Sequence, residues 1–183
     1  MTVTGIGNYS GRISTDRTSF KITGWDQDSL QALRAEIPDQ AYTGKALKPQ
    51  VAFYIEGTAD GEKFVLKPGT AVKIAYKDNK DAGTATATIT GKGELADMKP
   101  IKVTFTIEQA DISGATVGKV KNQTLKGVAA TPVPKVKIGR KILKADRDFK
   151  VKYMLNGVKG EAMMTITGTG NYTGVCHTTF IIQ

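Results

Sequence analysis

The sequence has few of the residues that most often carry catalysis. It contains a single cysteine, Cys176, a single histidine, His177, and one tryptophan among 183 residues. One cysteine excludes a disulfide within the chain. Because Cys176 and His177 are adjacent on an expected strand, their side chains should point to opposite faces and not pair as nucleophile and base. We therefore expect no enzyme here, with Cys176 buried and His177 exposed.

Long hydrophobic runs and a leading charged-then-apolar segment are also missing. No stretch approaches the roughly 20 apolar residues that cross a bilayer, and the N-terminus has no signal-peptide pattern. The formal charge of +9 leaves an anionic partner as an alternative, but the lysines alternate with apolar residues along VKIAYK and FKVKY. That spacing favours a solvated surface over a nucleic-acid groove. We expect no nucleic-acid partner, no membrane insertion by this segment, and a longer parent chain.

Internal repetition is what the sequence does contain. Residues 66–93 align without a gap to residues 143–170 at a shift of 77, so that TITG falls on TITG and Tyr76 on Tyr153. Self-similarity at a fixed period is the mark of a chain built from structural modules. The sequence therefore predicts two related modules.

Two further matches set the module boundaries. Residues 32–44 align with 115–127 at a shift of 83, and TGIGNYSG at 4–11 resembles TGTGNYTG at 167–174. The N-terminal segment matches only the end of a repeat. We therefore predict a partial module, then two full ones: the terminal strands of a preceding repeat as a hairpin over 1–24, repeat 1 over 25–108 and repeat 2 over 109–183.

Each repeat has the alternation expected of half-buried antiparallel strands. Alanine and isoleucine alternate with threonine along GTATATIT, and β-branched residues suit a pleated surface. The Asn156–Gly157 pair is a hairpin signal. Residues 28–37 have a helical spacing of leucines, but we predict a strand there because Pro38 follows. Short strands with closely spaced turn signals predict a β-sandwich. The predicted inward residues are Val72, Ile74 and Tyr76, and in the second repeat Phe149, Val151 and Tyr153.

Two motifs with a potential for ligand binding favour a structural interpretation. The G-x-G motifs at Gly91 and Gly168 precede a turn and a strand rather than a helix, so they should be turns that allow positive φ and not phosphate loops. Asp78, Asn79 and Asp81 provide oxygen ligands of the kind that calcium prefers. Lysines flank them and no further acid is evident. We predict a solvated turn, no metal site and no cofactor.

The ordered motifs YTGKALKPQV, LKPGTAVKIAYKDNKDAGTATATITGKG and TGTGNYTG with TTFII resemble tandem Ig-like repeats of bacterial surface proteins. The resemblance covers nearly the whole chain. It implies tandem Ig-like β-sandwich modules of an extracellular, multi-domain Gram-positive protein, either on the cell surface or secreted. Such modules serve as stalks, spacers or adhesion modules, and the resemblance brings no catalytic residues with it.

The sequence leaves two functions open. The first is a non-catalytic structural, spacer or adhesion segment whose partners are neighbouring modules of the same chain. The second is a carbohydrate- or cell-wall-binding module, with a cell-wall or host glycan or a host protein as partner. Aromatic side chains next to turns and linkers can stack on sugars or pack at module junctions. The candidate ligand contacts are Trp25, Tyr9 and Tyr172.

Overall fold

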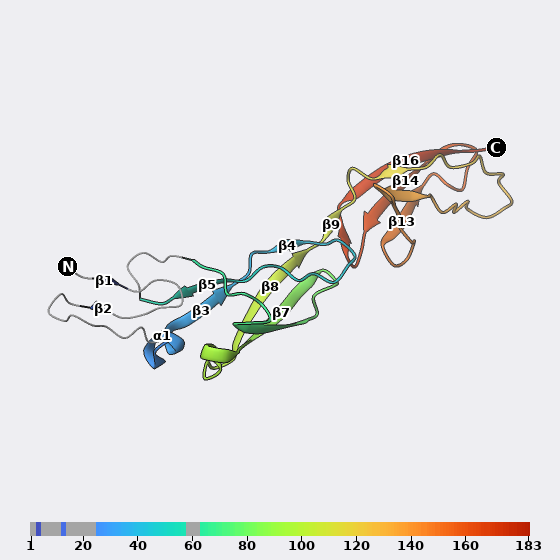
Figure 1. The fold of residues 1–183 in the computed structure, drawn as a ribbon. Helices are drawn as coiled ribbons and strands as arrows, with labels where there is room; N and C mark the ends of the chain where they lie inside the picture. Colours follow the sequence, from blue (N-terminus) through green and yellow to red (C-terminus); the bar gives the residue numbers. More distant parts are fainter. Residues whose placement is uncertain (1–2, 5–11, 14–24, 58–62) are drawn as a thin grey trace. The chain divides into compact units, whose positions relative to one another are not determined.

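The computed structural model describes residues 3–4, 12–13, 25–57 and 63–183, in which β-strands joined by turns and loops are the main regular structure and helix is scarce (Figure 1). The predicted all-β class is confirmed. The chain divides into two compact units. Unit 1 holds the described parts of Met1–Gln40, Ala46–Lys80 and Thr84–Thr106, and unit 2 consists of Ala41–Lys45, Asp81–Gly83 and Ile107–Gln183.

The first part of the chain contains one four-stranded sheet, in the order β4-β8-β7-β6, and the pairs β3-β5 and β1-β2. Its interior is aliphatic and aromatic, and Phe53, Val72 and Ile89 are fully buried. Burial alternates along β6 and β7 as predicted. The elements are β1 (Val3–Thr4), β2 (Arg12–Ile13), α1 (Gln27–Ala32), β3 (Leu33–Glu36), β4 (Gln40–Ala41), β5 (Ala52–Ile55), β6 (Val72–Lys77), β7 (Gly83–Gly91), the 3-10 helix η1 (Gly93–Leu95) and β8 (Ile101–Glu108).

Unit 2 contains two three-stranded sheets, β10-β11-β12 and β13-β14-β16, and the parallel pair β15-β9. A buried cluster joins residues from both sheets, including Val136 of β11, Phe149 of β13 and Ile166 of β14. Cys176 belongs to this cluster, and burial raises the pKa of its thiol. The strands are β9 (Ala110–Asp111), β10 (Thr116–Val117), β11 (Val136–Ile138), β12 (Lys141–Ile142), β13 (Phe149–Met154), β14 (Gly160–Gly168), β15 (Tyr172–Thr173) and β16 (Val175–Ile182).

Strand pairing in the two aligned segments has the same register. In β6-β7, Val72 pairs with Gly91, and in β13-β14, Phe149 pairs with Gly168, 77 residues later in each case. All six pairs of these hairpins correspond in this way. The N-terminal pair β1-β2 corresponds to the pair β14-β16. Thr4 pairs with Arg12, and the aligned residue Thr167 pairs with Val175 at the start of β16.

The two aligned tyrosines have matching surroundings. Tyr76 donates a hydrogen bond of 2.6 Å to the carbonyl of Pro49, and Tyr153 donates one of 3.0 Å to the carbonyl of Pro132. Each ring meets a phenylalanine edge-on, with centroids 6.4 Å and 6.5 Å apart. Partial burial raises the pKa of both hydroxyls. Equivalent residues in the two segments therefore have equivalent structural roles.

The strand predicted over 28–37 is wrong in its first half. Gln27–Ala32 form helix α1, and only Leu33–Glu36 form strand β3. The cause is an N-cap, because the Asp26 carboxylate accepts a hydrogen bond of 2.7 Å from the Ser29 N–H. Leu30 is the buried residue of this helix. Pro38 lies beyond strand β3 and does not prevent a helix over Gln27–Ala32, whereas the Asp26 cap favours one.

The G-x-G motifs are turns, but their first glycine has a different role from the one predicted. Positive φ occurs at the second glycine, +57° at Gly93 and +64° at Gly170. At Gly168 a Cβ would lie 2.7 Å from the carbonyl oxygen of Thr173, so the chain needs glycine there for close backbone approach. Gly91 makes the same kind of approach to Leu95.

Candidate functional site

The turn between β14 and β15 makes polar contacts with several other segments of unit 2. Strand β15 lies parallel to β9, with Tyr172 opposite Ala110. Backbone bonds flank this pairing, because the Ala110 N–H donates to the carbonyl of Asn171 at 3.0 Å. Gln109 Nε2 donates to the carbonyl of Gly170 at 2.7 Å. The turn therefore presents the side chains of residues 169–172 from a fixed backbone.

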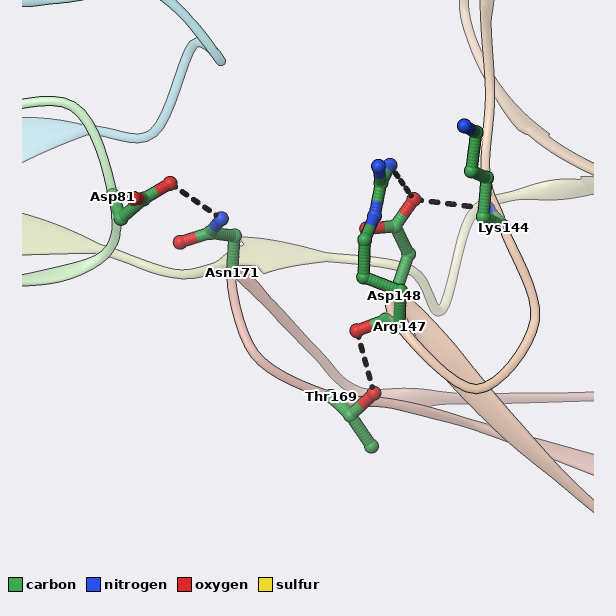
Figure 2. Close-up of polar contacts among 6 residues, drawn as sticks. All are labelled: Asp81, Lys144, Arg147, Asp148, Thr169 and Asn171. Atoms are coloured by element: carbon green, nitrogen blue, oxygen red, sulfur yellow. Dashed lines mark hydrogen bonds and ion pairs between the residues drawn. The ribbon is translucent and has the colours of Figure 1, made fainter.

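Asn171 connects this turn to the segment Asp81–Gly83, which also belongs to unit 2. Its Nδ2 donates to the Asp81 carboxylate at 2.9 Å (Figure 2), and its Oδ1 accepts from the Ala82 N–H at 2.7 Å. One side chain therefore satisfies a side-chain acceptor and a backbone donor together. Asp81, predicted as a solvated turn residue, is exposed but is fixed by this contact.

Tyr172, the residue after Asn171, contacts a second tyrosine and a lysine in unit 2. Tyr42 meets Tyr172 edge-on, with centroids 5.5 Å apart and an interplanar angle of 84°. The Lys141 ammonium lies 5.0 Å from the Tyr42 ring centroid and 5.2 Å from that of Tyr172. A cation over aromatic faces is attracted by their quadrupoles. Gly44 leaves room for it, since a Cβ there would lie 3.0 Å from Lys141 Nζ.

The Tyr172 hydroxyl lacks a hydrogen bond of normal geometry within the described part of the chain. The closeness of Tyr172 to Lys141 nevertheless raises the pKa of the Lys141 ammonium, and Tyr42 adds to the effect. Lys141 therefore remains a cation at neutral pH. Its contacts join Tyr42 and Tyr172, which are distant from each other in the sequence.

A second polar group fixes the turn before β13. Asp148 is buried, with 5% of its surface exposed, and its carboxylate accepts from both Arg147 Nε and Nη2 at 2.8 Å. It also accepts from the Lys144 N–H at 2.9 Å, and Thr169 Oγ1 donates to the Arg147 carbonyl at 3.2 Å (Figure 2). The Arg147 side chain, followed by the Lys144 N–H, holds the pKa of Asp148 below its usual range.

The three predicted ligand contacts are in different surroundings. Tyr172 is buried, with 2% of its surface exposed, and belongs to the core cluster of unit 2. Trp25 is half-buried in unit 1, and its ring lies 6.0 Å from that of Phe64. Tyr9 is outside the described residues. A ligand role for these residues stays a prediction.

His177 and Cys176 have the exposure that the sequence predicts. Cys176 is buried and His177 is exposed, with His177 Nδ1 3.2 Å from Thr165 Oγ1. In the described part of the chain, no three His, Cys, Asp or Glu side chains lie together in a way that could hold a metal ion. None of the helices in that part has the length and apolar character that a bilayer crossing requires.

Of the contact residues in unit 2, the sequence indicated Tyr172 but not its partners. Tyr42 and Asn171 lie in the YTGK and GNYTG stretches, which the repeat alignment marks as recurrent, and that was the available signal. Lys141 and Asp148 had no such signal, since their roles depend on tertiary neighbours. No protein-family model matches the chain, and no curated protein matches it.

Proposed function

We propose that this chain is a non-catalytic structural segment, a spacer or adhesion stalk made of tandem Ig-like modules, from an extracellular bacterial surface protein. Its partners in this proposal are the neighbouring modules of its parent chain. The proposal rests on the resemblance of its motifs to that family and on the use that unit 2 makes of its polar side chains.

The observation that carries the proposal is the contact made by Asn171. Its two hydrogen bonds hold Asp81 and Ala82, which precede the second repeat in the sequence, to a turn of that repeat. Tyr42 contacts the same part of the chain differently, through an edge-on ring contact with Tyr172 and the Lys141 ammonium over its ring. Side chains that could have bound a ligand bind another segment of the same chain. Contacts that join segments of the chain are what a stalk under mechanical tension requires of its modules.

The matching registers support the modular part of the proposal. Homologous modules should repeat their pairing and their buried side chains, and β6-β7 and β13-β14 do so residue by residue. A stalk built from such modules gains length by repetition, since each added module contacts only its neighbours.

Binding to purified peptidoglycan tests the proposal against the alternative of a cell-wall-binding module. We expect the 183-residue chain to stay in the supernatant when peptidoglycan is sedimented, and to give no signal on a glycan array. Retention that Trp25→Ala abolishes, and that Tyr54→Ala leaves intact, would replace the spacer function with sugar recognition through Trp25. In a pulling experiment on single molecules, the spacer function predicts two unfolding events.

A further inference from the structure

The outward face of the sheet β13-β14-β16 has an apolar end. Met154, Met163 and Ile181 point away from the core there and are 61%, 43% and 42% exposed. Met154 pairs directly with Met163, and Ile181 pairs with Glu161, which lies two residues from Met163 on the same face of β14. These three side chains form one patch, which we call the methionine face.

The first repeat has polar residues at the same positions. The shift of 77 places Met154 on Lys77 and Met163 on Thr86, and Lys77 pairs with Thr86 just as the methionines pair. The shift of 75 that aligns the buried Phe105 with Phe180 places Ile181 on Thr106. Strands of this register therefore form without apolar residues on the outward face. Folding does not account for the methionine face.

Charged residues flank the methionine face along the strands. On one side lies the row Lys152, Thr165 and His177, which are cross-strand partners. On the other side of the two methionines, level with Ile181, lies Glu161, which is exposed. Along β13 and β14 the outward face therefore runs from the Lys152 cation through the two methionines to the Glu161 anion. A surface with this order complements a copy of itself turned end to end.

We propose that the methionine face is a surface through which two copies of this chain associate, sheet against sheet. A two-fold axis that lies across the strands at the level of Met154 and Met163 places each methionine over its counterpart. The same axis brings Lys152 of one copy within reach of Glu161 of the second copy. Such an interface is isologous, as in most homodimers, and stacked sheets pack about 10 Å apart.

The size of the face predicts a weak complex. Stable interfaces bury about 800 Å² on each partner, and three partly exposed side chains provide less. Each copy also has a formal charge of +9, so the two copies repel one another. We expect a reversible monomer–dimer equilibrium that responds to protein concentration. This inference does not depend on the spacer function.

Sedimentation equilibrium of the 183-residue chain over a concentration series tests the proposal. We expect the average mass to rise from one chain toward two. The triple variant M154K/M163T/I181T carries the residues of the first repeat, and it should weaken association at least about tenfold, the loss of about 1.4 kcal/mol. Val133→Thr is the control, because Val133 is 67% exposed in unit 2 and lies outside the sheet; it should associate like wild type.

A charge exchange provides a second test that leaves the apolar residues in place. Glu161→Lys should weaken association, since it places a cation opposite Lys152 of the second copy. Adding Lys152→Glu to that variant should restore association, because the pair is re-formed with opposite polarity. A wild-type chain that stays monomeric throughout the series overturns the proposal. Association that persists in the triple variant, or a charge exchange that gives no rescue, also overturns it.

Discussion

At the scale of single residues, Gly174 combines a left-handed backbone with a site that has no room for a side chain. Its φ is +85°, and a Cβ there would collide with the Asp111 carboxylate. That carboxylate accepts from the Ser113 N–H and hydroxyl, both at 2.8 Å. We predict that Gly174→Ala lowers the free energy of unfolding by about 1–3 kcal/mol, through backbone strain and a disturbed turn. Urea denaturation measures this.

Gly157→Ala is the matched control for that change. Gly157 lies in the turn before β14, nothing lies near its missing Cβ, and its φ is not in the left-handed region. Its substitution should change stability by no more than about 0.5 kcal/mol. Equal effects of the two substitutions would contradict the argument from backbone geometry.

Leu155 shows the opposite situation, a side chain where the backbone disfavours one. Its φ is +59°, and the aligned residue of the first repeat, Asp78, has a φ of +56°. Aspartate and asparagine tolerate this conformation better than leucine does. We predict that Leu155→Asn stabilises unit 2 by roughly 0.5–1 kcal/mol, and that Asp78→Leu destabilises unit 1 by a similar amount. Thermal melts measured on dilute protein test both, and a destabilising Leu155→Asn would show that the exposed leucine is stabilising.

Asp148 makes the stability of unit 2 depend on pH. Because its folded-state pKa lies below its usual range, the native state binds fewer protons than the unfolded state near that pH. The stabilisation is therefore present above the unfolded pKa of about 3.9 and is lost as pH falls through the folded pKa. Arg147 is 59% exposed, which weakens the ion pair.

Asp148→Asn should remove this dependence. We predict that it lowers the free energy of unfolding of unit 2 by about 1 kcal/mol at pH 7, mainly because the carboxylate's hydrogen bonds are lost. In strong acid the variant should be about as stable as wild type. Urea midpoints measured across the acid range test it. Asp146→Asn, in the same turn, is the control. The φ of +62° at residue 146 suits asparagine, so the urea midpoints of this variant should follow those of wild type. A parallel loss at every pH would mean that Asp148 acts by packing alone.

At the scale of elements, the turn between β14 and β15 holds a segment that is distant in sequence. The Ala82 N–H donates to Asn171 Oδ1, so this amide should exchange slowly with solvent. Asn171→Ala should speed its exchange about five- to tenfold or more, as expected for the loss of about 1–1.5 kcal/mol. Hydrogen exchange resolved by NMR measures it. Asn122→Ala, an exposed asparagine in a loop of unit 2, should leave the Ala82 amide unchanged.

The long hairpins could be predicted from the sequence because their alternation is strict. Ala85, Ala87 and Ile89 are buried along β7, as the period of two requires. Helix α1 could not be predicted from periodicity, because its segment has features of both helix and strand. The capping residue decides between the two. Asn156 was expected to shape a hairpin turn with Gly157. Both residues do lie in the turn that joins β13 to β14, and the Asn156 Nδ2 also donates to the Ala130 carbonyl at 2.9 Å, a partner 26 residues away that the sequence did not indicate.

The contacts around Asn171 could be predicted only in part for the same reason. Repetition of the GNYTG stretch marks the turn as important, and the sequence suggests an aromatic contact at Tyr172. Its partners come from Tyr42 and Lys141, which lie 130 and 31 residues away in the chain. No local pattern encodes such pairings, since they depend on which turns the fold brings together.

At the scale of the whole molecule, each unit has its own interior and its own natural probe. The only tryptophan, Trp25, lies in unit 1, and the only cysteine, Cys176, is buried in unit 2. Tryptophan fluorescence therefore reports on the unfolding of unit 1, and the reactivity of the Cys176 thiol reports on that of unit 2. Domains with separate cores can unfold independently. The two probes can show whether these units do so.

The matched isoleucines Ile89 and Ile166 provide the last prediction. They occupy aligned positions 77 residues apart, both are fully buried, and each pairs with an aligned residue of the neighbouring strand. Removal of one buried methylene costs about 1 kcal/mol. Ile166→Val should therefore shift the denaturation midpoint reported by Cys176 and leave the Trp25 midpoint in place, while Ile89→Val should do the reverse. If either substitution moves both midpoints equally, the two units unfold as one cooperative structure, and the boundary between them has no energetic meaning.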